Sequence, residues 1–223
     1  MKTVSIRGDF PRIYFNNTGD RNKILTVEQW GDVEWTSMQN AFYGCENLQI
    51  PAPDAPIFTG STISMANMLR GTTNFNSPVN HWDTSKVTNM GNMFYGASSF
   101  NQPVNDWIVD NVSIMSNMFR ESAFDQPLDN RNIGNVTAIG AMFEDNRYFN
   151  QDISMWNTSK VTNSQGMFKG AISFNQDIGS RTMSGVNAIG GMFYGASGFN
   201  QDLSTWDIHN VGVLDYSGNG LYL

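Results

Sequence analysis

Apolar and polar residues recur along this chain in one phrase, with a period of about 25 residues. The phrase is a Val, a Met or Ile three residues later, a Met-Phe pair and a Phe-Asn-Gln triplet. Its first position falls at Thr62, Val87, Val112, Val136, Val161, Val186 and Val211. One step, from Val112 to Val136, is 24 residues long. Such a period is typical of a chain that stacks one supersecondary unit many times, so it predicts a single elongated array.

Each unit contains two rhythms, which the unit from Val87 shows clearly. Between Val87 and Ala97 the apolar residues follow the spacing of one face of a short helix, and Gly96 is suited to its end. From Phe100 to Trp107 the apolar spacing is too irregular for a helix. This segment predicts a short strand centred on Val104, so each unit is expected to hold one helix and one strand.

Equivalent positions of successive units form columns, and three apolar columns predict the core. A single unit would leave them exposed, whereas stacking buries them as continuous ridges. They are the Met-Phe pairs from Met68-Leu69 to Met192-Phe193, the aromatic residues from Phe75 to Phe199 and the aliphatic residues from Val79 to Leu203.

The ends of the chain depart from the phrase. Residues 1–29 carry short alternating segments around turn residues and predict a β-rich N-terminal cap. Residues 30–210 form the repeat array, and residues 211–223 form a C-terminal cap or a truncated repeat.

One column mixes Trp with Arg, which a core position rarely accepts without a partner. It is therefore predicted to lie at an edge or to be partly exposed. Edge packing is the simpler interpretation, and a binding surface with amphipathic anchors is the alternative. The candidate binding residues are Trp82, Trp107, Arg131, Trp156, Arg181 and Trp206.

Three polar columns follow the second aromatic residue. The first is Asn76, Asn101, Asp125, Asn150, Asn175 and Asn200, whose side chains are predicted to satisfy backbone groups at the turns. The second is Gln102, Gln126, Gln151, Gln176 and Gln201. The third changes from Pro to three carboxylates, Asp152, Asp177 and Asp202. Hydrogen bonding within the turns is the favoured role for these. A Ca²⁺ site is the alternative, because Ca²⁺ prefers oxygen ligands, although one carboxylate per turn falls short of its usual coordination number.

The charge and the cysteine count exclude several functions. A net charge of −7 over 223 residues argues against nucleic acid or an anionic membrane as a partner. The single cysteine excludes an internal disulfide, and no Cys/His cluster has metal spacing. The chain lacks an apolar stretch long enough for a membrane span, and its start lacks the long apolar run of a signal peptide. Two alternatives follow: the protein is not exported by that route, or the chain is a fragment without its targeting segments.

The units resemble the 25- to 26-residue repeats of BspA-like bacterial surface proteins, a lipoprotein-type leucine-rich-like family. The residues that carry the resemblance are Trp82–Met90 with Met93–Gln102, repeated at Trp156–Met167 and Met192–Asp207. The segment Trp35–Pro51 is similar to a related Treponema-type repeat. The resemblance implies an α/β fold: a right-handed leucine-rich-repeat-like solenoid of about seven turns, each with one short strand and one short helix. It also places Cys45 in a small core position.

Function is expected to be recognition without catalysis. No Ser/His/Asp or Cys/His constellation, phosphate-binding loop or metal motif is present, so the chain is not expected to be an enzyme and needs no cofactor. The resemblance implies an adhesion-type module at the cell surface or outside the cell, with a protein or glycan partner. The alternative is a spacer or scaffold segment of a larger surface or phage-tail-like assembly.

Overall fold

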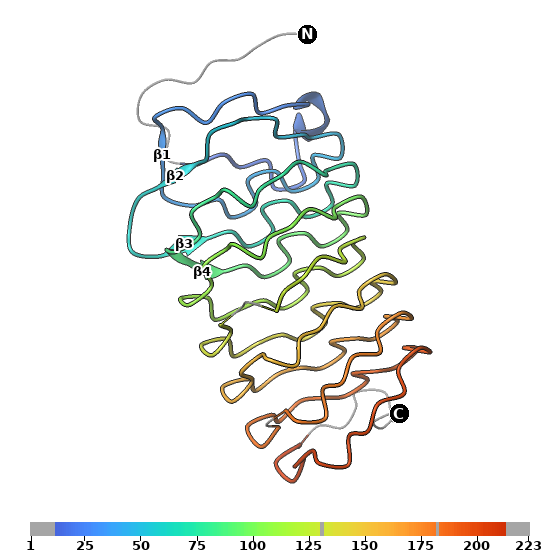
Figure 1. Cartoon of the computed structure of the whole chain (residues 1–223). Helices are drawn as coiled ribbons and strands as arrows, with labels where there is room; N and C mark the ends of the chain where they lie inside the picture. The colour runs from blue at the N-terminus through green and yellow to red at the C-terminus, as the bar shows by residue number, and fades with distance from the viewer. Residues whose placement is uncertain (1–11, 130–131, 182, 213–223) are drawn as a thin grey trace.

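The chain folds as a stack of irregular layers (Figure 1). Within each layer the chain runs across the molecule and back, and successive layers follow one another from the N-terminal to the C-terminal end. The computed structural model describes residues 12–129, 132–181 and 183–212. Backbone hydrogen bonds join each layer to the next at the period of the sequence repeat. Phe94 N donates to Met118 O at 3.0 Å, and Phe119 N donates to Met142 O at 2.9 Å. The sequence period is therefore the distance along the chain from one layer to the next.

Regular secondary structure is sparse. A 3-10 helix, η1, spans Arg21–Lys23. Strand β1 (Glu34–Trp35) pairs in parallel with β2 (Ile57–Phe58), and β3 (Ile63–Ser64) pairs in parallel with β4 (Val87–Asn89). Beyond β4, single parallel bridges continue the pairing in the order Asn89–Ile114, Ile114–Ala138, Ala138–Asn163 and Asn163–Ala188.

The predicted α/β fold is wrong. The described part of the chain contains no α-helix and only these four strands, each two or three residues long. It is therefore not a right-handed leucine-rich-repeat-like solenoid with a helix in every turn. The segment from Val87 to Ala97, predicted as a helix, begins in β4 and continues as turns. The segment around Val104, predicted as a strand, pairs with no strand in the described ranges.

The segment from Val87 to Ala97 is not helical because alternate backbone amides donate hydrogen bonds to different layers. Met93 N and Tyr95 N donate to carbonyl oxygens three residues earlier, whereas Asn92 N and Phe94 N donate to the next layer. An α-helix would require each of these amides to donate four residues back within the same segment. Asn92 also has a φ of 56°, in the left-handed region that ends a helix. Successive tight turns thus reproduce the apolar spacing of a helix without forming one.

The predicted core ridges are confirmed. Phe94, Phe119, Phe143, Phe168 and Phe193 stack with ring centroids 5.7–5.8 Å apart from layer to layer. Each also stacks on the second aromatic residue of its own layer, as Phe94 does on Phe100 at 3.9 Å. One position shifts: Ile63, rather than Thr62, is buried at the start of its unit, where β3 and β4 change register.

The N-terminal segment differs from its prediction in residues 12–29. These residues contain η1 and a single parallel bridge, Thr26–Gln49, but no strand. They pack on the first layer, where Phe15 N donates to Ala41 O at 3.1 Å. Cys45 is a buried core residue, as expected, and burial raises the pKa of its thiol to about 12. Residues 1–11 and 213–223, the rest of the predicted caps, lie outside the described residues.

Candidate functional site

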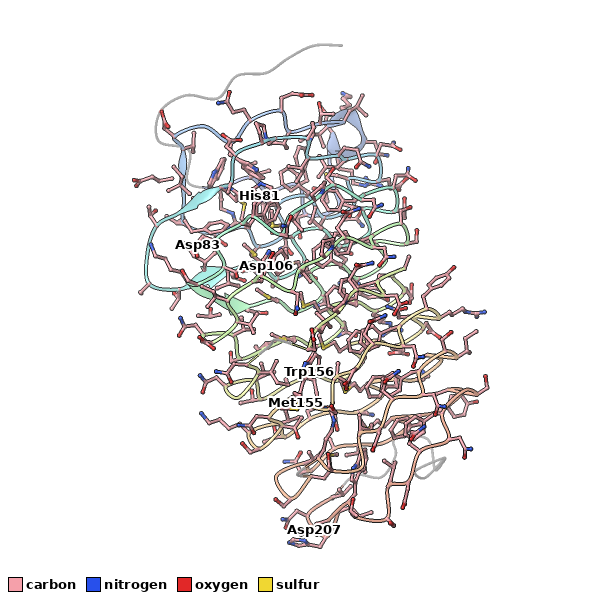
Figure 2. All side chains as sticks on the ribbon, in the orientation of Figure 1. His81, Asp83, Asp106, Met155, Trp156 and Asp207 are labelled. Atoms are coloured by element: carbon pink, nitrogen blue, oxygen red, sulfur yellow. The ribbon has the colours of Figure 1, made fainter. Side chains whose placement is uncertain are left out.

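The Trp column is buried, contrary to the predicted edge position. Trp82, Trp107 and Trp156 are each 3% exposed, and Trp206 and Arg181 are also buried. Arg131 lies outside the described residues. Because these side chains lie within the stack, they offer no surface for a partner. The residues that flank this column, such as His81, Asp106 and Met155, are exposed and lie in different layers of the stack (Figure 2).

A repeated hydrogen bond explains how Arg181 fits this column. The indole Nε1 atoms of Trp107 and Trp156 donate to Val79 O and Leu128 O, 28 residues earlier, both at 2.9 Å. Arg181 Nη2 donates to Ile153 O, which is the equivalent acceptor. The guanidinium therefore takes the place of the indole N–H of Trp107, Trp156 and Trp206. Burial lowers the pKa of Arg181 to about 10, so the side chain remains charged at neutral pH.

The three aspartates of the predicted Ca²⁺ alternative each bind their own turn. Asp152 Oδ1 accepts from Ser154 N, Asp177 Oδ1 from Gly179 N and Asp202 Oδ1 from Ser204 N, at 2.8–2.9 Å. This matches the hydrogen-bonding role favoured by the sequence. Within the ranges that the structure describes, no three His, Cys, Asp or Glu side chains gather closely enough to hold a metal ion.

The asparagine column forms the predicted ladder between layers. Asn76 Oδ1 accepts from Asn101 N at 2.9 Å, and the same bond recurs in the following layers. Gln side chains of the next column add a second bond, such as Gln126 Nε2 to Asn101 Oδ1 at 3.1 Å. These amides are satisfied within the stack and serve to join its layers.

A column of large polar residues follows the Met-Phe pairs. Arg70 lies over the rings of Tyr43 and Tyr95, with Cζ 5.0 and 4.5 Å from their centroids. Arg120 lies 5.0 Å from the centroid of Tyr95 on its other side. Farther along, Glu144 is buried between Arg120 and Lys169, at 3.0 Å from a nitrogen of each. Cation–π contacts and ion pairs thus run along one side of the stack. We call this side, which carries Tyr43, Arg70, Tyr95, Arg120, Glu144 and Lys169, the loop side.

The next column is glycine in most layers, and its exceptions mark one place. Gly96, Gly170 and Gly195 have φ values of 68–72°. Glu121 and Asp145 occupy the same position in two adjacent layers, with φ values of 54° and 55°. Most residues with a Cβ are strained in this region, Asn and Asp less than the others, and strained residues gather at functional sites.

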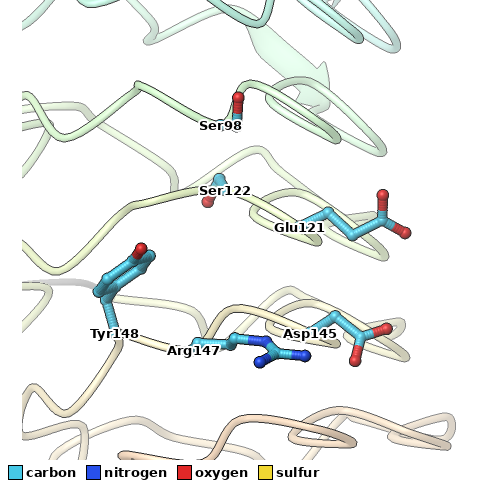
Figure 3. A pocket seen from close by; sticks show the side chains of 6 residues that line it. All are labelled: Ser98, Glu121, Ser122, Asp145, Arg147 and Tyr148. Carbon is cyan, nitrogen blue, oxygen red and sulfur yellow. The ribbon is translucent and has the colours of Figure 1, made fainter.

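The same place contains the shortened unit of the sequence. Phe119 and Phe124 are five residues apart, whereas Phe94 and Phe100, like the pairs of later layers, are six apart. We call residues 119–124 the short turn. Beside it lies a hollow of about 470 Å³, lined by Ser98, Glu121, Ser122, Asp145, Arg147 and Tyr148 (Figure 3). The missing residue of the short turn accounts for the space between the two longer turns.

A buried asparagine holds the two sides of the hollow. Asn146 stands where other layers carry Ala97 or Ala171. Its Nδ2 atom donates to Phe124 O at 2.9 Å, and its Oδ1 atom accepts from Tyr148 N and Phe149 N at 3.1 Å. In the next layer Ser173 Oγ donates to Arg147 O at 2.7 Å. The backbone that carries the lining residues is therefore fixed from both sides.

The hollow combines groups that can bind a polar molecule. Tyr148 is 62% exposed, and its ring rises from its own turn toward the turn of Ser122 (Figure 3). Glu121 lies 3.4 Å from Arg120, measured from Oε1 to Nε, so one carboxylate has a cation beside it. The hydroxyl of Ser122 donates to Phe119 O at 2.8 Å and is engaged in the turn.

Sequence reasoning missed this site, although two signals mark it. The signals are the 24-residue step from Val112 to Val136 and the replacement of glycine by Glu121 and Asp145 in one column. The residues that sequence reasoning selected instead occupy the buried Trp column and the aspartate turns.

In the parts of the chain that the structure describes, no helix is long and apolar enough to span a membrane.

Comparison with known proteins identifies a family. The family model described as "Mycoplasma protein of unknown function, DUF285" matches residues 12–131 and 115–218. No curated protein and no solved structure matches the chain. The two matched segments together cover well over half of its length. The chain therefore belongs to this family, Mycoplasma protein of unknown function, DUF285.

Proposed function

We propose that this protein is a non-catalytic recognition module that binds a protein or glycan partner through the loop side of its stack, with the hollow as the binding site. Stacked repeats commonly present a surface of this kind, on which side chains vary over a constant core. Here the stacked Phe columns keep one residue type in nearly every layer, whereas the column from Tyr43 through Arg70 to Lys169 changes its chemistry from layer to layer.

The observation that supports the proposal is the coincidence of two departures from the repeat. The short turn and two carboxylates at left-handed positions, Glu121 and Asp145, occur at the same hollow. Glycine, which neighbouring layers carry there, would relieve the strain, most of all at Glu121. A departure that costs stability at one surface site is consistent with selection for binding there.

Two further points support recognition over catalysis and a surface location. No histidine or cysteine lines the hollow, and Ser122 is hydrogen-bonded to a backbone carbonyl, so a nucleophile with a neighbouring base is missing there. The resemblance to BspA-like surface repeats supports a place at the cell surface or outside the cell. This location is part of the proposal.

The test is an array of glycans and extracellular-matrix proteins, probed with the purified protein and with an insertion variant. The variant carries one serine inserted after Ser122, which restores the six-residue spacing and fills the hollow. We expect binding by the wild-type protein and a loss of roughly tenfold or more in the variant, because the contact residues are displaced. Tyr14→Ala, which removes an exposed tyrosine outside both the hollow and the column from Tyr43 to Lys169, is the matched control.

Two results would overturn the proposal. A blank array with the wild-type protein would favour the spacer or scaffold function in a larger assembly. Equal binding by the wild-type protein and a folded insertion variant would move the recognition site away from the hollow. A thermal melt of each variant establishes that it is folded before binding is compared.

A further inference from the structure

We propose that the hollow binds a neutral saccharide, with Tyr148 as the stacking platform and Glu121, Asp145 and Arg147 as hydrogen-bonding partners for hydroxyl groups. This inference rests on the proposed function and names the class of partner for the same site. The size of the hollow, about 470 Å³, lies within the usual range for small-molecule sites. It suits one or two sugar rings rather than a folded partner.

The charges around the hollow favour a neutral ligand over an ionic one. Glu121 lies beside Arg120, which also pairs with the buried Glu144, and Lys169 binds the other oxygen of Glu144. Asp145 lines the hollow together with Arg147. Three carboxylates are thus accompanied by three cationic side chains, so neither a strong anion nor a strong cation finds an unbalanced charge. Carboxylates accept and guanidinium groups donate, which matches the mixed character of hydroxyl groups.

Tyr148 supplies the remaining feature that sugar binding needs. Its ring is largely exposed, yet its backbone amide is held by the buried side chain of Asn146 at 3.1 Å. A tyrosine ring offers a flat apolar face with a polar tip, and few rotatable bonds must be fixed when it binds. The carbon–hydrogen face of a pyranose ring can pack on such a surface while its hydroxyl groups face Arg147, and a second ring can extend toward the carboxylates, which lie on the side away from Tyr148 (Figure 3). Because the turn is already fixed, little ordering is required on binding.

The experiment uses the full chain and saturation-transfer NMR with methyl glycosides as probes. The neutral set contains hexosides and N-acetylhexosaminides, and the anionic set contains sialosides and glucuronides. We expect transfer from the wild-type protein to at least one neutral glycoside. Tyr148→Ala should reduce the affinity roughly tenfold or more, because the stacking surface is removed. Tyr194→Ala should leave it unchanged, and Tyr148→Phe should retain most of it.

The possible outcomes separate this inference from the broader proposal. Transfer confined to anionic glycosides, or unchanged transfer in Tyr148→Ala, would overturn the neutral-saccharide site. The neutral-saccharide site would also be overturned if no glycoside receives transfer while a matrix protein binds the wild type but not the serine-insertion variant. That result would support recognition of a protein partner through the hollow. No transfer together with a blank array would overturn both. Tyr148 and Tyr194 are both exposed, so neither alanine variant is expected to unfold the protein.

Discussion

At the scale of single residues, two left-handed positions recur in each layer, and their occupants separate ordinary layers from special ones. The first position is Asn or Gly in six layers and Ala141 in the seventh. The second is Gly in most layers but Glu121 and Asp145 at the hollow. Gly tolerates this conformation, Asn and Asp tolerate it in part, and other residues are strained by about 1–2 kcal/mol. The greatest strain is therefore expected at Ala141 and Glu121.

Ala141 provides a test of this strain away from the lining of the hollow. Ala141→Gly should raise the free energy of unfolding by about 0.5–1 kcal/mol, because relief of strain exceeds the greater flexibility of Gly in the unfolded chain. Ala138→Gly, at an ordinary backbone position of the same layer, should lower it by about 0.5–1 kcal/mol. Urea unfolding of both variants measures the difference. Destabilisation of similar size in both would contradict the account.

Arg181 is the second informative residue, because it performs the role of an indole at the cost of a buried charge. Its Nη2 atom reaches Ile153 O, and it lies 5.8 Å from the ring centroid of Trp156. Its Nε atom is buried without an acceptor in the described part of the protein. The sequence correctly suggested that Arg in this column needs a partner. It could not show that a backbone carbonyl supplies it.

Arg181→Trp should therefore stabilise the protein. The indole N–H can donate to Ile153 O and extend the stack of Trp156 and Trp206, while the desolvated charge is removed. We expect the free energy of unfolding to rise by about 1–3 kcal/mol, within the range of about 1–4 kcal/mol for apolar replacement of buried ion pairs. Arg181→Ala, which loses the hydrogen bond and leaves a cavity, should lower it. A lower urea midpoint for Arg181→Trp than for the wild-type protein would contradict this role.

At the scale of elements, the turn is the structural unit, and this is where sequence reasoning failed. The spacing of Val87, Met90 and Met93 is that of a helical face, but it also arises when successive tight turns direct every third or fourth side chain inward. Asn92 and Gly96, four residues apart, signal left-handed turns. Their recurrence at fixed offsets in every unit could have separated the two cases, whereas apolar spacing alone could not.

The aspartate turns make a prediction about acid stability. Backbone and hydroxyl hydrogen bonds from Ser154 lower the pKa of Asp152, and the same bonds from Ser204 lower the pKa of Asp202. A carboxyl group whose pKa is lower in the folded state stabilises the fold above its unfolded pKa of 3.8. This contribution is lost as the pH falls through the folded pKa.

The double variant Asp152→Asn/Asp202→Asn should retain the turn hydrogen bonds but not the titration. Between about pH 5 and pH 2 its free energy of unfolding should fall less steeply than that of the wild-type protein. Urea unfolding at a series of pH values measures both slopes. Parallel slopes would show that these carboxyl groups do not contribute to acid sensitivity, and a steeper slope in the variant would reverse the predicted sign.

At the scale of the whole molecule, the periodic sequence predicted the stack and its core but not the path of the chain within a layer. The Phe columns and the asparagine ladder lie as expected, because each column has one environment in all layers. The Trp column is buried and not at an edge, because a backbone carbonyl accepts a hydrogen bond from Arg181 and allows its burial. The hollow arises from a missing residue and two substitutions, and it becomes visible only when three neighbouring layers are placed side by side.

The most direct test of the central claim, that the hollow is a binding site maintained against stability, is one paired measurement on Glu121→Gly/Asp145→Gly. Both substitutions restore the residue that other layers carry and remove the two carboxylates. We expect the melting temperature to rise, by roughly 2–4 °C for each kcal/mol of strain relieved. Binding to the array partner of the wild-type protein should be lost at the same time. A lower melting temperature, or a higher one with binding unchanged, would contradict the claim.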